Sequence, residues 1–141
     1  MDPAQIARAA PVYLDANILI RMIESAPDDR AAIRSALAPY VEQGAVFITS
    51  QLSLAEVLVH PIRKKDSARI ARYQRLLTDF VAAQPVSREV LLTAARLRAQ
   101  TPALRTPDAI HLATALLAAA EVFLTGDRGI KSSPACPVMH V

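Results

Sequence analysis

Short apolar segments alternate with helical segments along the chain, and this alternation limits the possible folds more than any other feature of the sequence. Strands are predicted at residues 12–14, 45–49, 84–86, 122–125 and 138–141. Helices are predicted between them, at residues 17–24, 28–43, 51–60, 67–81, 87–100 and 106–120. Because parallel strands need crossover helices, we expect an α/β fold: a three-layer α/β/α arrangement around a central, mostly parallel sheet of about five short strands.

The length of 141 residues predicts one domain, spanning residues 1–141, in which residues 1–11 form a loose N-terminal extension. The N-terminus carries Asp2 and Arg8 and has no continuous apolar stretch, which argues against a signal peptide. The longest apolar run, residues 109–124, is interrupted by His111 and Glu121 and predicts a buried helix followed by a strand. We therefore expect a cytoplasmic protein with no membrane segment.

Prolines and capping residues predict where the helices begin and end. Ser50, Ser87 and Thr106 are expected N-caps, and Pro107 would occupy the first position of the last helix. Proline disrupts a helix interior, so Pro39 should kink or split the helix at 28–43 and Pro61 should end the helix at 51–60.

The charge composition is compatible with a polyanionic partner. The formal net charge is +3, and all basic residues other than Lys64, Lys65 and Lys131 are arginines, whose guanidinium suits bidentate phosphate contacts. High-GC coding would produce the same excess of arginine. A basic strip at Arg69, Arg72 and Arg75 is either a solvated helix face, which is the commoner case, or a docking surface for RNA or an acidic partner.

Four acidic residues occupy similar places in the predicted topology. Asp15 and Asp127 follow strands, whereas Glu56 and Asp108 lie in helices that begin just after a strand or loop. A parallel sheet would bring all four toward the carboxyl ends of its strands, where ligands bind. Carboxylates this close repel one another unless a cation neutralises them, and Mg²⁺ or Mn²⁺ suits oxygen ligands. Alternatively, Asp15 only caps the following helix, and the acids lie at these places by chance.

Several other kinds of site are excluded or disfavoured. With three glycines, the chain contains neither GxGxxG nor a Walker motif. Its single cysteine allows no internal disulfide and no thiolate cage, so any metal must use oxygen or histidine ligands. No serine lies in a nucleophile-elbow context.

Four segments, LDANILI, TSQLSLAEVLVHP, RTPDAIHLATALL and FLTGDRGI, together resemble the PIN-domain nucleases, most closely the VapC-type toxins of bacterial toxin–antitoxin pairs. The resemblance extends from about Val12 to the end of the chain. It implies that Asp15, Glu56, Asp108 and Asp127 bind Mg²⁺ or Mn²⁺ for endonucleolytic cleavage of RNA. It also implies a cognate antitoxin as partner, and it makes a homodimer expected.

The resemblance has departures, and other polar residues are possible supports. Where the family commonly has Thr or Ser after the first aspartate, this chain has Ala16. Asn17 matches a frequent family asparagine that could orient Asp15, although a role at the helix start is an equal alternative. Further supporting candidates are Ser53, Thr125 and Arg128. His111 is more often a packed residue in such a setting than a functional one.

These observations lead to the hypothesis of a metal-dependent ribonuclease that acts as the toxin of a type II pair. The metal would activate the attacking water and neutralise charge on the phosphodiester. Alternatives are a PIN-domain nuclease of housekeeping RNA processing, a phosphatase or receiver-like domain with Asp15 at its strand end, and a non-catalytic module that retains only the fold.

Overall fold

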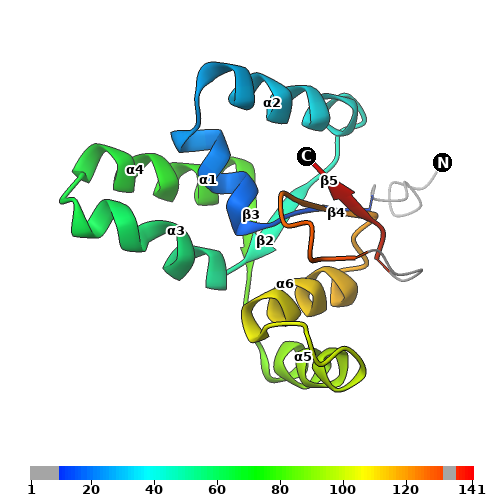
Figure 1. Ribbon diagram of the computed structural model, residues 1–141. Helices are drawn as coiled ribbons and strands as arrows, with labels where there is room; N and C mark the ends of the chain where they lie inside the picture. The colour runs from blue at the N-terminus through cyan, green and yellow to red at the C-terminus, as the bar shows by residue number, and fades with distance from the viewer. Residues whose placement is uncertain (1–9, 132–135) are drawn as a thin grey trace, which may run out of the picture.

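The computed structural model describes residues 10–131 and 136–141. Within them, the strands are β1 (Val12–Leu14), β2 (Phe47–Ser50), β3 (Val81–Gln84), β4 (Val122–Thr125) and β5 (Val138–His140). They form one sheet in the order β3-β2-β1-β4-β5, and every neighbouring pair is parallel (Figure 1). The predicted α/β fold with a parallel sheet is confirmed.

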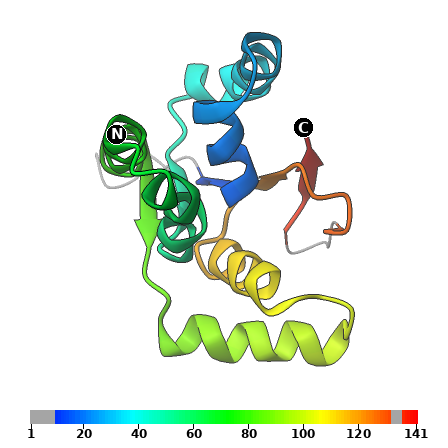
Figure 2. The same cartoon turned by 60° about the vertical axis from the view of Figure 1, so that its left-hand side comes forward.

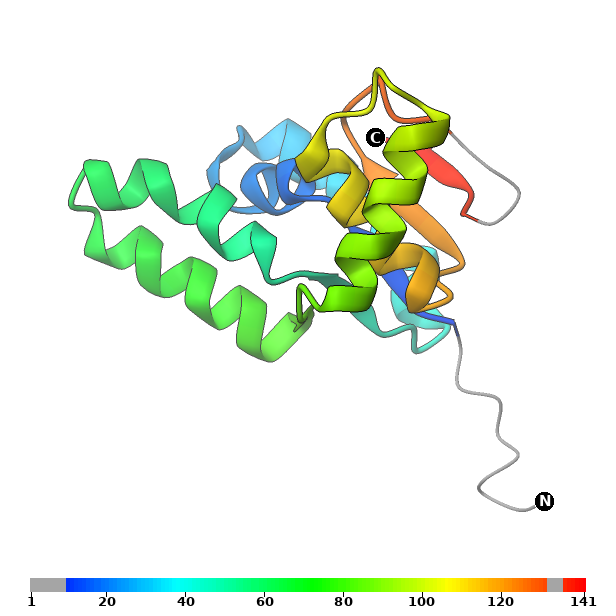
Figure 3. The ribbon, with the colours of Figure 1, turned by 90° about the horizontal axis from the view of Figure 1, so that it is seen from below.

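Helices cover both faces of this sheet. They are α1 (Ala16–Glu24), α2 (Pro27–Glu42), α3 (Leu52–Arg63), α4 (Ser67–Arg75), α5 (Arg88–Gln100) and α6 (Thr106–Leu117). Figure 2 shows α1 and α2 on the opposite side of the sheet from α5 and α6, and Figure 3 shows α3 and α4 running side by side. The three-layer α/β/α arrangement is therefore confirmed.

The central strand β1 divides the core between the two faces. Val12 and Leu14 pack into the cluster that α1 to α4 cover, whereas Tyr13 packs into the cluster beneath α6. This is the two-residue alternation of a strand buried on both faces. In the α6 layer, Ala109 packs toward α5 and Ala115 toward the sheet, which explains why this helix is so poor in charge.

The third strand differs from its prediction. It lies at Val81–Gln84, before Pro85, whereas the sequence pattern favoured residues 84–86. Because proline has no N–H to donate, it suits the end of a strand better than its middle. The helix predicted at 67–81 correspondingly ends early: α4 stops at Arg75, and a π-helical turn, Leu76–Phe80, leads directly into β3.

Prolines and caps also differ in part from expectation. Pro39 lies inside a continuous α2, and Pro61 lies inside α3, which ends two residues later at Arg63. The cap of α6 is Arg105, so Thr106 is its first residue. Ser87 is confirmed as the cap of α5, with its hydroxyl accepting the Val90 N–H.

Three helices end in the same left-handed turn. Gly44, Lys65 and Ala119 have φ of 71°, 52° and 53° and follow α2, α3 and α6. After α6, the Ala120 N–H donates to the Ala115 carbonyl and the Ala119 N–H to the Leu116 carbonyl. This pair of bonds defines a Schellman motif. After α3, the Asp66 N–H donates to the Pro61 carbonyl and the Lys65 N–H to the Ile62 carbonyl, so α3 ends in the same motif past Pro61.

The predicted N-terminal extension lies mostly outside the described residues, which begin at Ala10. From there the chain enters β1 directly, and the Pro11 carbonyl accepts the Glu121 N–H at 2.9 Å. Across the described parts of the chain, none of the helices has the length and apolar character needed to cross a membrane.

Candidate metal centre

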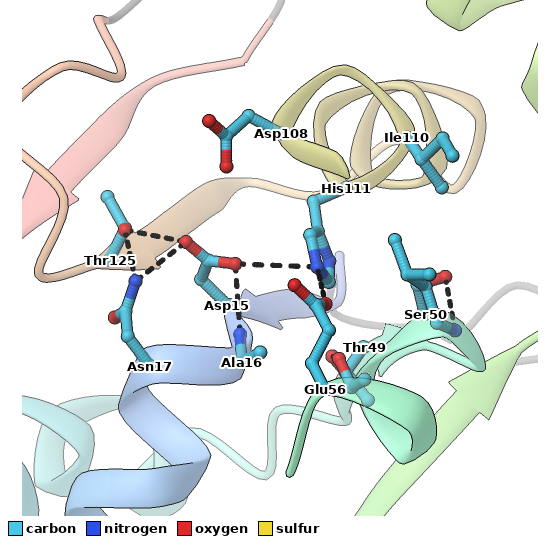
Figure 4. Close-up of polar contacts among 12 residues, drawn as sticks. Asp15, Ala16, Asn17, Thr49, Ser50, Glu56, Asp108, Ile110, His111 and Thr125 are labelled. Atoms are coloured by element: carbon cyan, nitrogen blue, oxygen red, sulfur yellow. Dashed lines mark hydrogen bonds and ion pairs between the residues drawn. The ribbon is translucent and has the colours of Figure 1, made fainter. Parts of the chain in front are cut away.

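The carboxyl ends of β1 and β4 form the edge where the candidate acids lie. Tyr13 pairs with Phe123 and Leu14 with Leu124, so Asp15 and Thr125 leave the two strands at the same level. The Asp15 N–H continues the ladder by donating to the Leu124 carbonyl at 3.0 Å. Strand register therefore places Asp15 at the centre of the edge (Figure 4).

Asp15 is both the N-cap of α1 and the most buried of the four acids, with 4% of its surface exposed. Its Oδ1 accepts the Ala16 N–H at 2.9 Å. Its Oδ2 accepts the Thr125 hydroxyl at 2.7 Å and the Asn17 side-chain amide at 2.9 Å. The cap interpretation and the site interpretation of Asp15 are thus compatible.

The charge of Asp15 is poorly compensated. Burial raises the pKa of its carboxyl above the ordinary value; the nearby His111, the Thr125 hydroxyl and the Ala16 N–H oppose this shift, and Asp108 adds to it. No arginine or lysine in residues 10–131 or 136–141 pairs with it, and its only ion-pair neighbour there is His111, 3.7 Å away. A buried carboxylate without a cationic partner is costly and suits a bound cation.

Glu56 reaches the same place from α3. Its Oε1 lies 2.5 Å from Nε2 of His111, the imidazole that also approaches Asp15 Oδ1. Figure 4 shows the Glu56 carboxylate next to this ring, close to Asp15. The other ring nitrogen, Nδ1, lies 2.6 Å from the Tyr13 hydroxyl. The two acids, which are far apart in sequence, are thus brought together around one histidine.

Asp108 lies in the first turn of α6, above Asp15 in Figure 4. Its Oδ2 accepts a hydrogen bond from Arg105 Nε at 3.1 Å. Arg105, Asp108 and Asp127 also line a pocket of about 290 Å³ at this edge. Because the Arg105 side chain is otherwise exposed, it can leave Asp108 without burying a charge.

Asp127 is linked to the centre through Thr125. Its N–H donates to the Thr125 hydroxyl at 3.0 Å, and its Oδ1 accepts the Gly129 N–H at 2.8 Å. The Thr125 hydroxyl in turn donates to Asp15. The Asp127 carboxylate therefore belongs to its own turn and lines the pocket beside Asp108, rather than contacting Asp15.

The proposed supporting residues fall into two groups. Asn17 and Thr125 touch Asp15 directly, and the Asn17 Oδ1 also accepts the Gly126 N–H. Ser53 instead pairs with the Thr49 hydroxyl at 2.7 Å in the interior, and Arg128 is exposed beyond Asp127. The family commonly has a hydroxyl side chain at the position of Ala16; in this chain the Thr125 hydroxyl contacts Asp15 instead.

The model of the PIN domain family matches residues 12–134. The chain belongs to the PIN domain family. No curated protein sequence matches it. Among solved structures, a chain from a toxin–antitoxin complex of Klebsiella pneumoniae is 23% identical, with a TM-score of 0.66 over 91% of this chain and 95% of that one.

Two further structures have the same PIN-type fold. VapBC2 from Rickettsia felis, bound to a promoter DNA fragment, is 16% identical, with a TM-score of 0.72 over 92% of this chain and 97% of that chain. FitAcB from Neisseria gonorrhoeae is 17% identical, with a TM-score of 0.68 over 92% and 96% of the two chains. Since these identities are low, the likeness concerns the fold.

The donor set of this PIN domain fits a hard cation by its chemistry. Asp15, Glu56 and Asp108 offer carboxylate oxygens, and Asp15 is buried without a basic partner among the described residues. As the side chains stand, no three Asp, Glu, His or Cys residues in the described ranges are grouped closely enough to hold a metal. Asp108 is bound to Arg105 and would have to exchange this partner for the ion, whereas Glu56 contacts His111 through Oε1 and would offer the ion its other oxygen, Oε2.

His111 is the site residue of the PIN domain that sequence reasoning ranked too low. It is packed and hydrogen-bonded, as expected, with 1% of its surface exposed. Its partners, however, include two of the four candidate acids. Its position one turn after Asp108 predicted that it could face the site, but packing was the favoured interpretation, and its contacts with Glu56 and Tyr13 could not be predicted.

Proposed function

We propose that this PIN domain is a Mg²⁺- or Mn²⁺-dependent endoribonuclease that acts as the toxin of a type II toxin–antitoxin pair. The observation that carries the proposal is the buried Asp15 carboxylate, which has Glu56 and Asp108 beside it and no arginine or lysine partner in the described chain. The fold likeness to chains of toxin–antitoxin complexes supports the toxin assignment.

The residues have distinct roles in this proposal. Asp15, Glu56 and Asp108 would hold the metal, and Asp127 would bind a second ion or position water. A bound ion would activate water and stabilise charge on the phosphodiester. Asn17 and Thr125 fix the orientation of Asp15 through its Oδ2. Arg128, which is exposed and follows Asp127 directly, would meet a substrate phosphate.

A hollow away from the acids supports the existence of a protein partner. About 600 Å³ in volume, it has an apolar floor that includes Ile33, Leu37 and Phe80. Arg30, Arg34 and Arg72 stand around it together with one acid, Glu42. An apolar peptide segment with acidic side chains would complement this surface, as expected of an antitoxin. Arg72 of the predicted basic strip lies here, whereas Arg69 is paired with Glu24.

Asp15→Asn tests the proposal most directly. The substitution keeps the shape of the side chain but removes the charge that would hold the metal, so RNA cleavage in Mg²⁺ should fall by at least about 100-fold. Asp79→Asn, an exposed change outside the site, is the control and should cleave like the wild type. A folded Asp15→Asn protein with wild-type cleavage would refute the mechanism.

The same variant tests the toxin assignment in cells. Expression of the wild type alone should arrest growth, and co-expression of the neighbouring antitoxin gene should restore it. Asp15→Asn should be harmless in both settings. Cleavage in vitro without growth arrest would favour a housekeeping RNA-processing nuclease instead.

A further inference from the structure

His111 connects the acids to the interior of the sheet. It lies on α6, and its ring packs edge-on against Tyr13, with 5.8 Å between centroids and 73° between planes. Tyr13 is itself stacked on Phe123 at 4.9 Å and is fully buried. The imidazole is therefore anchored to residues of β1 and β4, the two strands whose ends form the candidate metal centre.

The hydrogen bonds define which nitrogen carries a proton. Nε2 faces the carboxylate oxygens of Glu56 and Asp15, which only accept when ionised, so Nε2 must donate. In the neutral ring, Nδ1 then accepts, and the Tyr13 hydroxyl is placed to donate to it. In that ring state, the Tyr13 hydroxyl favours the Nε2–H tautomer.

Glu56 needs such an anchor. Its side chain is 34% exposed on α3, and a glutamate in that position has several free rotamers. The hydrogen bond between Glu56 Oε1 and His111 Nε2, at 2.5 Å, connects Glu56 to the other residues of the candidate metal centre. Without it, the carboxylate would be free to turn into solvent, away from Asp15.

We propose that His111 is a positioning residue: its ring, fixed by Tyr13, holds the Glu56 carboxylate beside Asp15 and so presets the second carboxylate of the metal centre. The inference rests on the proposed function, since it assigns His111 a role toward the metal. It does not make His111 a ligand. Metal-site residues are commonly oriented by such outer partners, whose loss lowers metal affinity by about 10- to 100-fold.

The test is Mn²⁺ affinity, measured by calorimetry, in a double-mutant cycle between His111 and Glu56. His111→Ala should weaken Mn²⁺ binding by about 10-fold or more. In a Glu56→Gln background, His111→Ala should weaken Mn²⁺ binding no further, because the carboxylate that His111 positions has already been replaced by an amide. Equal losses in both backgrounds, or wild-type affinity in His111→Ala, would overturn the proposal.

Conservative variants separate positioning from folding. His111→Gln keeps a donor near the Nε2 position and should bind Mn²⁺ more tightly than His111→Ala does. Tyr13→Phe keeps the aromatic stack but loses the hydroxyl, and it should bind Mn²⁺ more weakly than the wild type does. Thr114→Val is the matched control, a buried polar change on the same helix, and within the described residues the Thr114 hydroxyl bonds only the Ile110 carbonyl. It should bind Mn²⁺ like the wild type. If His111→Ala does not fold, these variants decide the question: no recovery in His111→Gln and no loss in Tyr13→Phe would contradict the proposal.

A metal-free readout distinguishes this proposal from the proposed function. Nitrogen-15 NMR of the imidazole should show Nε2 protonated in the wild type and should show a shifted Nε2–H signal in Glu56→Gln. An Nδ1–H tautomer in the wild type, or an Nε2–H signal unchanged by Glu56→Gln, would refute the proposal that His111 holds Glu56. This conclusion would apply even if the wild type binds Mn²⁺. Failure of the wild type to bind Mn²⁺ would instead refute the proposed function.

Discussion

At the scale of single residues, Asp15 combines a stabilising and a destabilising role. It caps α1 and accepts three hydrogen bonds, yet burial keeps its pKa raised. A group whose pKa is higher in the folded chain than in the unfolded chain stabilises the fold at low pH. That contribution is fully present below the unfolded value of about 3.9 and is lost as pH rises through the raised value.

We therefore expect the stability of the wild type relative to Asp15→Asn to decline between pH 4 and pH 7. Other titrating groups are common to both proteins, so their effects largely cancel in the difference. Metal-free thermal melts of both proteins across this range measure it, and the Tm difference is expected to move in favour of Asp15→Asn as pH rises. A Tm difference that stayed constant, or moved in favour of the wild type, would contradict the assigned pKa direction.

The amino-acid sequence predicted where the acidic residues lie better than it predicted which residues they contact. Asp15 was identifiable because a carboxylate at the end of an apolar strand needs an explanation. Glu56 and Asp108 were placed near it by topology, and the structure brings both toward Asp15. The bridge through His111 was not predictable, because it depends on which way a ring on α6 turns and on the Tyr13 hydroxyl below it.

At the scale of elements, helix ends were less predictable than helix cores. Patterns of apolar residues located α1 to α6, but Pro61 and Pro39 did not act as stops. Nothing in the structure explains why the exposed Pro39 is tolerated, whereas Pro61 is buried against the rest of the fold, a contact that the local sequence does not show. The early end of α4 has the same origin: Val81 pairs with Phe47 in the sheet, so the chain must leave the helix before it.

The left-handed turn after α6 gives a prediction on stability. Ala119 adopts φ of 53°, a conformation that is unfavourable for alanine and free of strain for glycine. Ala119→Gly should therefore stabilise the protein by about 0.5–1 kcal/mol, measured by urea denaturation. The neighbouring Ala118 has an ordinary helical φ of −82°, so Ala118→Gly should destabilise it. Equal effects of the two changes would contradict the role assigned to the turn.

At the scale of the whole molecule, one face of α3 is apolar and exposed. Leu54, Leu58, Val59 and Ile62 line a shallow depression there, and Ile62 is 57% exposed. The depression is almost without polar surface, as expected for a face that a second copy covers. We propose this face as the contact of the homodimer that the family resemblance implies.

Ile62→Asp should convert the proposed dimer to a monomer, because it would bury a charge in the contact. Analytical ultracentrifugation over a range of concentrations measures the change. Leu91→Asp, on the exposed face of α5, is a control of similar exposure and should leave the assembly state unchanged. A wild type that sediments as a monomer at all concentrations would refute this use of the α3 face.

The side chain of Asn17 connects the carboxyl ends of strands β1 and β4. It donates to Asp15 and Thr125 and accepts from Gly126, so the ends of β1 and β4 are tied together by the protein alone. The part of the proposed centre that β1 and β4 contribute is thus in place before any ion arrives. A chelator should then stop the proposed RNA cleavage while leaving the chain folded, and supply of the cation, rather than refolding, would determine how quickly the proposed activity returns.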